Sequence, residues 1–182
     1  MKLAAIIDAV TDRIGRVVCW SILVMVLLQF AVVVARYVFS TSVLFGIPAV
    51  WLQEGIVYLH GIAILLGTSY SMLWNRNVRV DILYERASPR VQDLTELFGN
   101  LLFVLPLCIV IAWASLPNVT MAWAVKEGSI EPNGIPLRYL LKALIFGFCA
   151  LVSLQAISSI IRAGARLAGR STAPIYRTDT SL

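Results

Sequence analysis

Residues 17–35 read VVCWSILVMVLLQFAVVVA, nineteen consecutive positions without an aspartate, glutamate, lysine or arginine. Three more charge-free runs follow at residues 55–75, 97–125 and 143–161, with lengths of 21, 29 and 19 residues. About 20 apolar residues in a helix, at about 1.5 Å per residue, span the roughly 30 Å hydrocarbon layer of a bilayer. The four runs therefore predict an all-α integral membrane protein with four transmembrane helices.

The composition of the chain agrees with this fold class. Of its 182 residues 59% are hydrophobic and 14% are charged, and the mean hydropathy of +0.84 lies outside the range of soluble domains. We place the spans at about 17–38, 51–74, 94–121 and 140–162, in a single membrane domain of residues 1–168. We expect residues 169–182 to form a disordered cytoplasmic tail. The loops are too short for a soluble catalytic domain, so the sequence predicts no enzyme.

Basic residues are distributed unevenly between the two sides of the membrane. One side receives 11 of them: Lys2, Arg13, Arg16, Arg76, Arg79, Arg86, Arg90, Arg162, Arg166, Arg170 and Arg177. The other side receives 4: Arg36, Lys126, Arg138 and Lys142. Cytoplasmic loops of membrane proteins carry the excess of lysine and arginine. We therefore expect both termini and the middle loop in the cytoplasm, and the first and third loops outside.

The segment before the first span has an amphipathic pattern. Its apolar residues recur at helical spacing: Leu3, Ile7, Val10, Ile14 and Val17. Asp8, Asp12 and Arg16 follow one another at intervals of four on another face. This pattern predicts an N-terminal amphipathic helix at the cytoplasmic surface that runs into the first span. At the other end of the chain, we expect Arg162, Arg166 and Arg170 to hold the last helix against anionic lipid.

The third span has more length than a bilayer needs. Ser88 and Pro89 suit the N-cap and first position of a helix. A helix that ran unbroken from Pro89 to Val125 would measure about 55 Å. We expect it to kink or stop at Pro106 or Pro117, because proline removes a helical hydrogen bond.

Ionisable groups at membrane depth usually mark the coupling sites of pumps and transporters, and this chain has few of them. Cysteines aside, His60 is the only titratable side chain clearly inside a charge-free run. Glu54 lies about one turn inside Trp51, near the outer interface, so we expect it to pair with Arg36 rather than to carry protons. A single histidine cannot supply both axial ligands of a haem. The sequence contains no phosphate loop, metal cluster or nucleophile constellation, and we predict no cofactor.

Uncharged polar side chains inside the spans are expected to form hydrogen bonds between helices. They are Gln29, His60, Asn100, Asn118 and Gln155. The three cysteines, Cys19, Cys108 and Cys149, each stand alone in an apolar context. We expect them to be small buried residues without disulfides.

Several short motifs occur in order along the chain. Residues 36–39 read RYVF, residues 51–58 read WLQEGIVY and residues 76–84 read RNVRVDILY. Farther on stand Glu127, Ser129, Gly134, Pro136, Tyr139 and Lys142, then Leu154 and Gln155. This pattern, over about residues 15–165, resembles the small membrane subunit of tripartite ATP-independent periplasmic (TRAP) transporters, the DctQ-like family. Many relatives have two adjacent acids after the tryptophan, whereas this chain has Gln53 before Glu54.

The resemblance implies a scaffold subunit in a bacterial inner membrane. Its partners would be a large multi-spanning subunit, which holds the substrate and sodium sites, and a soluble periplasmic binding protein. The transporter would import organic anions, such as carboxylic or sugar acids, with sodium, and no substrate-binding residue is expected on this chain. Structural or partner-contact roles would fall to Arg36, Trp51, Glu54, Arg79, Asp81, Glu127, Arg138 and Lys142. Of these, Arg79 and Asp81 would order the cytoplasmic loop.

Two other functions fit a four-helix membrane protein. One is a self-sufficient small exporter or channel that works as a homo-oligomer, with Glu54 as its coupling acid. The other is a membrane anchor for an enzyme complex, although the lone histidine and the unpaired cysteines argue against haem and thiol versions of it.

Overall fold

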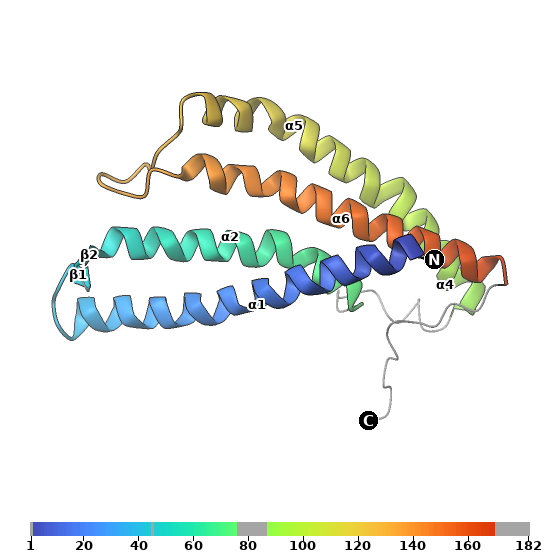
Figure 1. Cartoon of the computed structure of the whole chain (residues 1–182), viewed down its shortest axis with the longest axis horizontal. Coiled ribbons are helices and arrows are strands. Elements are labelled where there is room, and N and C mark those ends of the chain that lie inside the picture. The colour runs from blue at the N-terminus through green and yellow to red at the C-terminus, as the bar shows by residue number, and fades with distance from the viewer. Residues whose placement is uncertain (1, 45, 76–86, 170–182) are drawn as a thin grey trace.

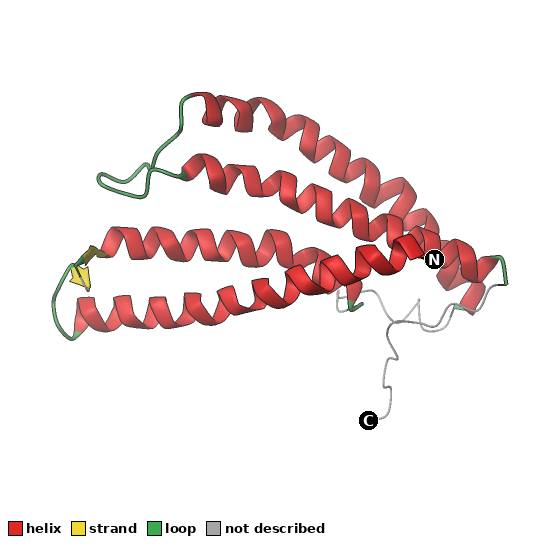
Figure 2. Cartoon of the chain, in the orientation of Figure 1, coloured by secondary structure: helices red, strands yellow, loops and turns green. Residues whose placement is uncertain are grey.

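The computed structural model describes residues 2–44, 46–75 and 87–169. Four helices in this part of the chain are long and apolar enough to cross a membrane, which confirms the predicted all-α fold class. The helices are α1 (Lys2–Tyr37), α2 (Ala49–Leu73), the continuous α4 (Pro89–Gly99), η1 (Asn100–Val104) and α5 (Leu105–Ala124), and α6 (Arg138–Leu167). Figure 2 shows how little of the described chain lies outside them. The cytoplasmic location of the termini stays a prediction.

The helices form two antiparallel pairs, α1 with α2 and α5 with α6 (Figure 1). The pairs lie side by side and diverge toward the end that carries the loop between α5 and α6. Helix α6 holds them together, because it contacts α1, α2, α4 and α5. The first turns of α1 lie near the last turns of α6, whereas the rest of α1 runs along α2.

The amphipathic N-terminal segment is the beginning of α1 and not a separate helix. The whole element is 36 residues long, about 54 Å at helical rise. Gly15 lies where that segment meets the first span, and it is buried against α2. A Cβ atom at this position would lie 2.1 Å from the Tyr70 ring, so only glycine allows the two helices to approach this closely.

A short ribbon replaces the first loop. Strand β1 (Val43–Leu44) pairs antiparallel with β2 (Ile47–Pro48), with Val43 opposite Pro48. Gly46 stands in the turn with a φ of +80°, a conformation that glycine adopts without strain. The backbone N–H of Ala49 then donates to the Ser42 carbonyl at 2.8 Å, which closes the ribbon onto the start of α2.

Helix α5 departs from regular geometry just before Pro106, one of the two predicted kink points. Proline lacks an N–H, and its ring clashes with the carbonyl four residues earlier in a regular helix. The π-helical segment η1 ends two residues before Pro106, and the Leu105 N–H bonds to the Asn100 carbonyl, five residues back. Pro117 lies inside α5 and ends no element.

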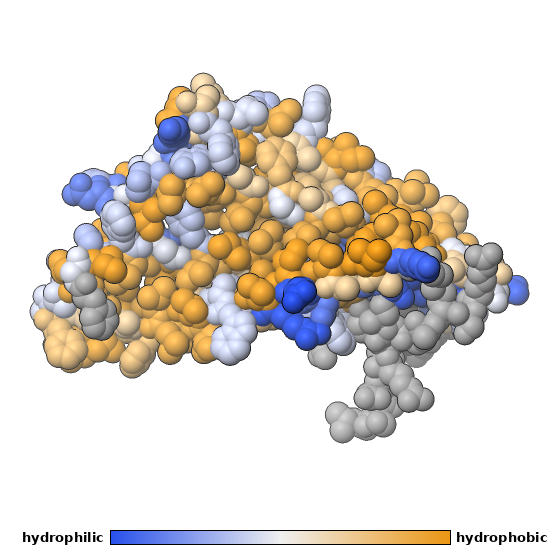
Figure 3. Space-filling view, viewed as in Figure 1, coloured by the Kyte–Doolittle hydropathy of each residue, from blue (hydrophilic) through white to orange (hydrophobic). Residues whose placement is uncertain are grey.

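Few side chains of the described residues are buried. A small core of Cys108, Cys149 and Val152 packs between α5 and α6. In the most apolar stretches of the four long helices only 11% to 28% of the residues are buried. Apolar side chains therefore cover much of the broad face (Figure 3), where lipid or another membrane subunit would contact them.

Candidate functional site

The loop between α5 and α6 is fastened to the first turns of α2. Glu54 accepts a hydrogen bond from the Ser129 hydroxyl, and its second oxygen accepts one from the Ile135 N–H at 2.5 Å. One turn earlier, the Trp51 indole N–H donates to the Asn133 carbonyl at 2.6 Å. We call these five residues the loop cluster. It joins the two helix pairs at the end where they diverge.

Gly134 makes the loop cluster possible. A Cβ atom there would lie 2.3 Å from the Ser129 hydroxyl oxygen and 2.6 Å from Glu54 Oε1. Any larger residue would therefore push the loop away from α2.

The predicted ion pair between Arg36 and Glu54 is wrong. Arg36 is exposed in the last turn of α1, and no ion pair joins it within the described ranges. The Glu54 carboxylate is already satisfied by Ser129 and Ile135, which lie more than 70 residues later in the sequence. Glu54 is therefore bound by the α5–α6 loop and not by the neighbouring helix α1.

Three of the predicted contact residues meet at the start of α6. The Glu127 carboxylate lies 2.5 Å from Lys142 Nζ and 3.5 Å from Arg138 Nε. Lys142 Nζ also donates to the Asn118 side-chain oxygen of α5 at 3.0 Å. We call these four residues the Glu127 cluster. It fixes the loop to both α5 and α6, beside the loop cluster.

A third cluster lies at the opposite end of α6 and binds the beginning of α1. Asp8 is 5% exposed and accepts hydrogen bonds from three α6 side chains. The donors are the Ser158 hydroxyl at 2.7 Å, the Gln155 amide at 3.2 Å and the Arg162 guanidinium, which is also its ion-pair partner. Asp8 therefore does not lie on a solvated face of an amphipathic helix.

Arg166 performs the same role one turn later, toward α4. Its guanidinium bonds to Asp93 at 2.5 Å and to Glu96 at 2.7 Å. The expectation that Arg162 and Arg166 face anionic lipid is corrected by these contacts, since both guanidinium groups face acids of this chain. Arg170, the third member of that predicted set, lies outside the described residues.

A comparison with protein families shows to which kind of membrane protein the chain belongs. A family model described as the DctQ component of tripartite ATP-independent periplasmic transporters matches residues 25–166, well over half of the chain. The chain belongs to the DctQ family. It is thus a small subunit of a TRAP transporter and not an enzyme, as the resemblance implied. Searches of curated proteins and of solved structures gave no match.

The matched range of this DctQ chain contains the loop cluster, the Glu127 cluster and both acids that bind Arg166. Asp8 lies outside it, although its partner Arg162 lies inside. Arg79 and Asp81, which the resemblance assigned to the cytoplasmic loop, lie outside the described residues. Their role stays a prediction.

The polar side chains inside the DctQ helices differ in their hydrogen-bond partners. Asn118 and Gln155 form the expected bonds between helices, to Lys142 and Asp8. Asn100 donates instead to the Glu96 carbonyl of its own helix. Gln29 and His60 are exposed, and neither has a hydrogen-bond partner among the described residues. The cysteines divide likewise: Cys108 and Cys149 are buried, whereas Cys19 is exposed.

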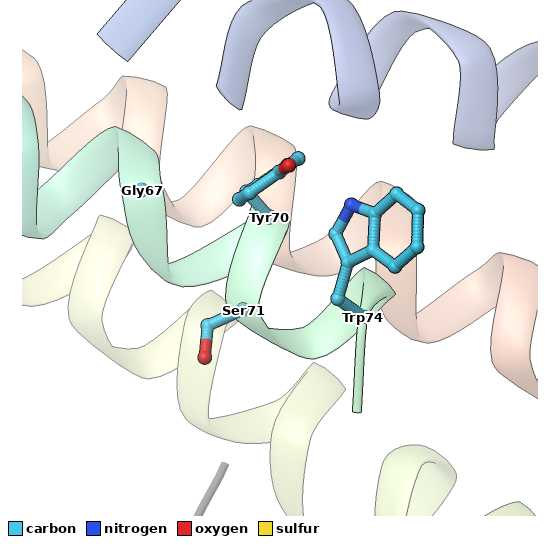
Figure 4. Close-up of a pocket in the computed structure, with 4 residues that line it drawn as sticks. All are labelled: Gly67, Tyr70, Ser71 and Trp74. Atoms are coloured by element: carbon cyan, nitrogen blue, oxygen red, sulfur yellow. The ribbon is translucent and has the colours of Figure 1, made fainter. Parts of the chain in front are cut away.

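A pocket of about 540 Å³ lies beside the last turns of α2 in the DctQ chain (Figure 4). Its described lining consists of Gly67, Tyr70, Ser71 and Trp74, without a carboxylate, histidine, lysine or arginine. The Tyr70 and Trp74 rings meet edge to face at 6.1 Å. Within the described ranges, no group of three His, Cys, Asp or Glu side chains is placed to hold a metal. The described part of this lining therefore contains no charged side chain.

Proposed function

We propose that this DctQ-family chain is the scaffold subunit of a sodium-coupled TRAP importer in a bacterial inner membrane. Its partners are a large multi-spanning subunit and a periplasmic binding protein, and its cargo is an organic anion such as a carboxylic or sugar acid. One observation carries the proposal. Five acidic side chains that contact another helix or the α5–α6 loop already accept hydrogen bonds from donors of this chain. They are Asp8, Glu54, Asp93, Glu96 and Glu127.

The arrangement of the loop supports a second part of the proposal. With both termini in the cytoplasm, the loop between α5 and α6 faces the periplasm. Glu54 fastens this loop from α2, and Lys142 fastens it from α6. A loop held from both helix pairs presents one fixed surface, which suits the docking of a loaded binding protein.

Reconstitution tests the proposal. The chain is co-expressed with the large subunit of its transporter, purified through a tag on this chain and placed in liposomes with the binding protein outside. We expect the large subunit to co-purify, and uptake of organic anion to require an inward sodium gradient and all three proteins. Uptake that persists without this chain would contradict the proposal.

The runner-up function, an exporter that works alone, needs Glu54 as a free coupling carboxylate. The bonds from Ser129 and Ile135 weigh against that role. Purified chain in liposomes should show no proton-driven transport. Transport that Glu54→Gln abolishes would support the exporter instead.

A further inference from the structure

Two polar side chains are exposed near the middle of helices that are long and apolar enough to cross a membrane. His60 is close to the middle of α2, which begins at Ala49 and ends at Leu73. Gln29 lies three residues from the middle of the charge-free run 17–35. Neither has a hydrogen-bond partner in the part of the chain that the structure describes. Hydrocarbon offers none, so leaving both groups toward lipid is strongly unfavourable.

Gln29 lines one groove, and the lining of this groove includes one residue of α2, Ile56. The groove has a volume of about 400 Å³ and lies between α1 and α2, lined by Met25, Val26, Gln29, Phe30, Val33 and Ile56. Gln29 is the one polar residue in this lining, whose surface is almost entirely apolar. His60 follows Ile56 by one helical turn, which places it on the same face of α2. Val57, one turn before His60, and Ile64, one turn after it, are both more than half exposed and extend this face in the two directions.

The apolar lining and the two polar side chains together favour one kind of occupant for the groove. A lipid acyl chain would fill the apolar part but has no donor or acceptor for Gln29 and His60. Irregular protein segments do not enter lipid-exposed hydrocarbon, because their backbone groups would lose their hydrogen bonds. A transmembrane helix can supply both the apolar surface and a polar side chain at this depth, and helices in membranes associate through such bonds.

We propose that Val26, Gln29, Phe30, Val57, His60 and Ile64, the Gln29–His60 face, pack against a transmembrane helix of the large subunit. That helix places a hydrogen-bonding side chain, such as Ser, Thr, Asn or Gln, opposite Gln29 and His60. The inference rests on the proposed function, because its partner is the large subunit named there. It adds which face of this chain forms the contact.

Photo-cross-linking tests the face directly. A benzophenone amino acid is placed at position 26 of the tagged chain, which is co-expressed with the large subunit and irradiated in native membranes. The matched control is position 24. Val24 and Val26 are both exposed, at 44% and 55%, but point about 200° apart around the helix.

We expect position 26, and not position 24, to form a cross-link with the mass of one small and one large subunit. Equal cross-linking from both positions would overturn the inference. So would products at position 26 that contain only lipid or a second copy of this chain. If the unmodified chain does not co-purify with the large subunit at all, the proposed function itself fails, which separates the two outcomes.

Replacing the two polar side chains with leucine gives a second test of the inference. Gln29→Leu and His60→Leu break no hydrogen bond or ion pair within the described chain, so each variant should elute from gel filtration as the unmodified chain does. Each should lower recovery of the large subunit by roughly threefold to tenfold, the range for one hydrogen bond between membrane helices. Thr68→Val is the control, because the Thr68 hydroxyl already bonds to the Ile64 carbonyl of its own helix. Full recovery with the double variant would overturn the inference.

Discussion

Asp8 is a buried charge that depends entirely on α6 for its partners. Its removal would leave the Arg162 guanidinium, with 17% of its side chain exposed, without a counter-charge. Breaking a buried ion pair in this way destabilises proteins by about 3 to 5 kcal/mol. We predict that Asp8→Ala lowers the free energy of unfolding by about 3 kcal/mol, measured by denaturant titration in detergent micelles.

A matched control stands one turn later on the same helix. Asp12 pairs with Arg16, whose side chain is 71% exposed. Exposed ion pairs contribute at most about 1 kcal/mol, so Asp12→Ala should change stability much less than Asp8→Ala. Equal losses in the two variants would show that the burial of Asp8 does not matter.

The Glu54 carboxylate should control the dynamics of the loop that it binds. Hydrogen bonds to a charged group contribute about 1.5 to 3 kcal/mol, which corresponds to roughly a tenfold to hundredfold change in local opening. We predict that Glu54→Ala accelerates amide exchange at Ile135 by that factor, measured by hydrogen exchange and mass spectrometry of the peptide with residues 129–137. Exchange in the α6 peptide around Val152 should not change.

At the residue level, five of the side chains predicted to have structural or partner-contact roles take part in contacts of the α5–α6 loop, while their contact with another subunit stays a prediction. Trp51, Glu54, Glu127, Arg138 and Lys142 all lie in the two clusters that hold the α5–α6 loop. The partner of Glu54 was predicted wrongly, because Ser129 and Ile135 reach it through the folding of a loop 75 to 81 residues away. Spacing along one helix cannot reveal such a pairing.

The packing of α1 on α2 depends on the absence of a side chain at Gly15. A Cβ atom there would lie 2.6 Å from Tyr70 Cβ, which cannot move without its helix. Overpacking of this kind costs about 1 to 3 kcal/mol. We predict that Gly15→Ala lowers the thermal midpoint of the purified chain, measured by circular dichroism in detergent.

Gly55→Ala is the control for this substitution. Gly55 also lies in a helix, and a Cβ atom there would meet no atom within 4 Å. Alanine stabilises such positions by up to about 1 kcal/mol, so the midpoint should stay or rise. A similar fall in both variants would mean that glycine matters here for reasons other than the approach of Tyr70.

At the element level the charge-free runs were sufficient to predict four long helices. The chemistry of proline predicted a kink or stop at Pro106 or Pro117; a π-helical segment precedes Pro106, whereas Pro117 lies inside α5. The π-helical segment from Asn100 to Val104 lies between two contacts with α6, at Arg166 on one side and in the Cys108 core on the other. Those contacts are tertiary and leave no local pattern in the sequence.

Across the whole molecule, the two helix pairs are joined differently at their two ends. Asp8 and Arg162 join them through helices, whereas Glu54 and Trp51 join them through a loop. We predict that the double variant Trp51→Phe/Glu54→Ala broadens the distance between spin labels at positions 57 and 140, measured by pulsed electron resonance after replacement of the native cysteines. Labels at 75 and 167, near the other end, should keep a narrow distribution. Equal broadening at both ends would contradict this division.

The position of α6 after the other three long helices has a consequence for biosynthesis. When the ribosome has delivered the first three long helices, Asp8, Asp93, Glu96 and Glu127 exist, but their partners Arg138, Lys142, Arg162 and Arg166 do not. These acids gain their cationic partners only when α6 has been inserted into the membrane. Assembly is therefore completed only after α6 has been translated, and a product that stops before α6 exposes four unmatched negative charges by which quality control can recognise it.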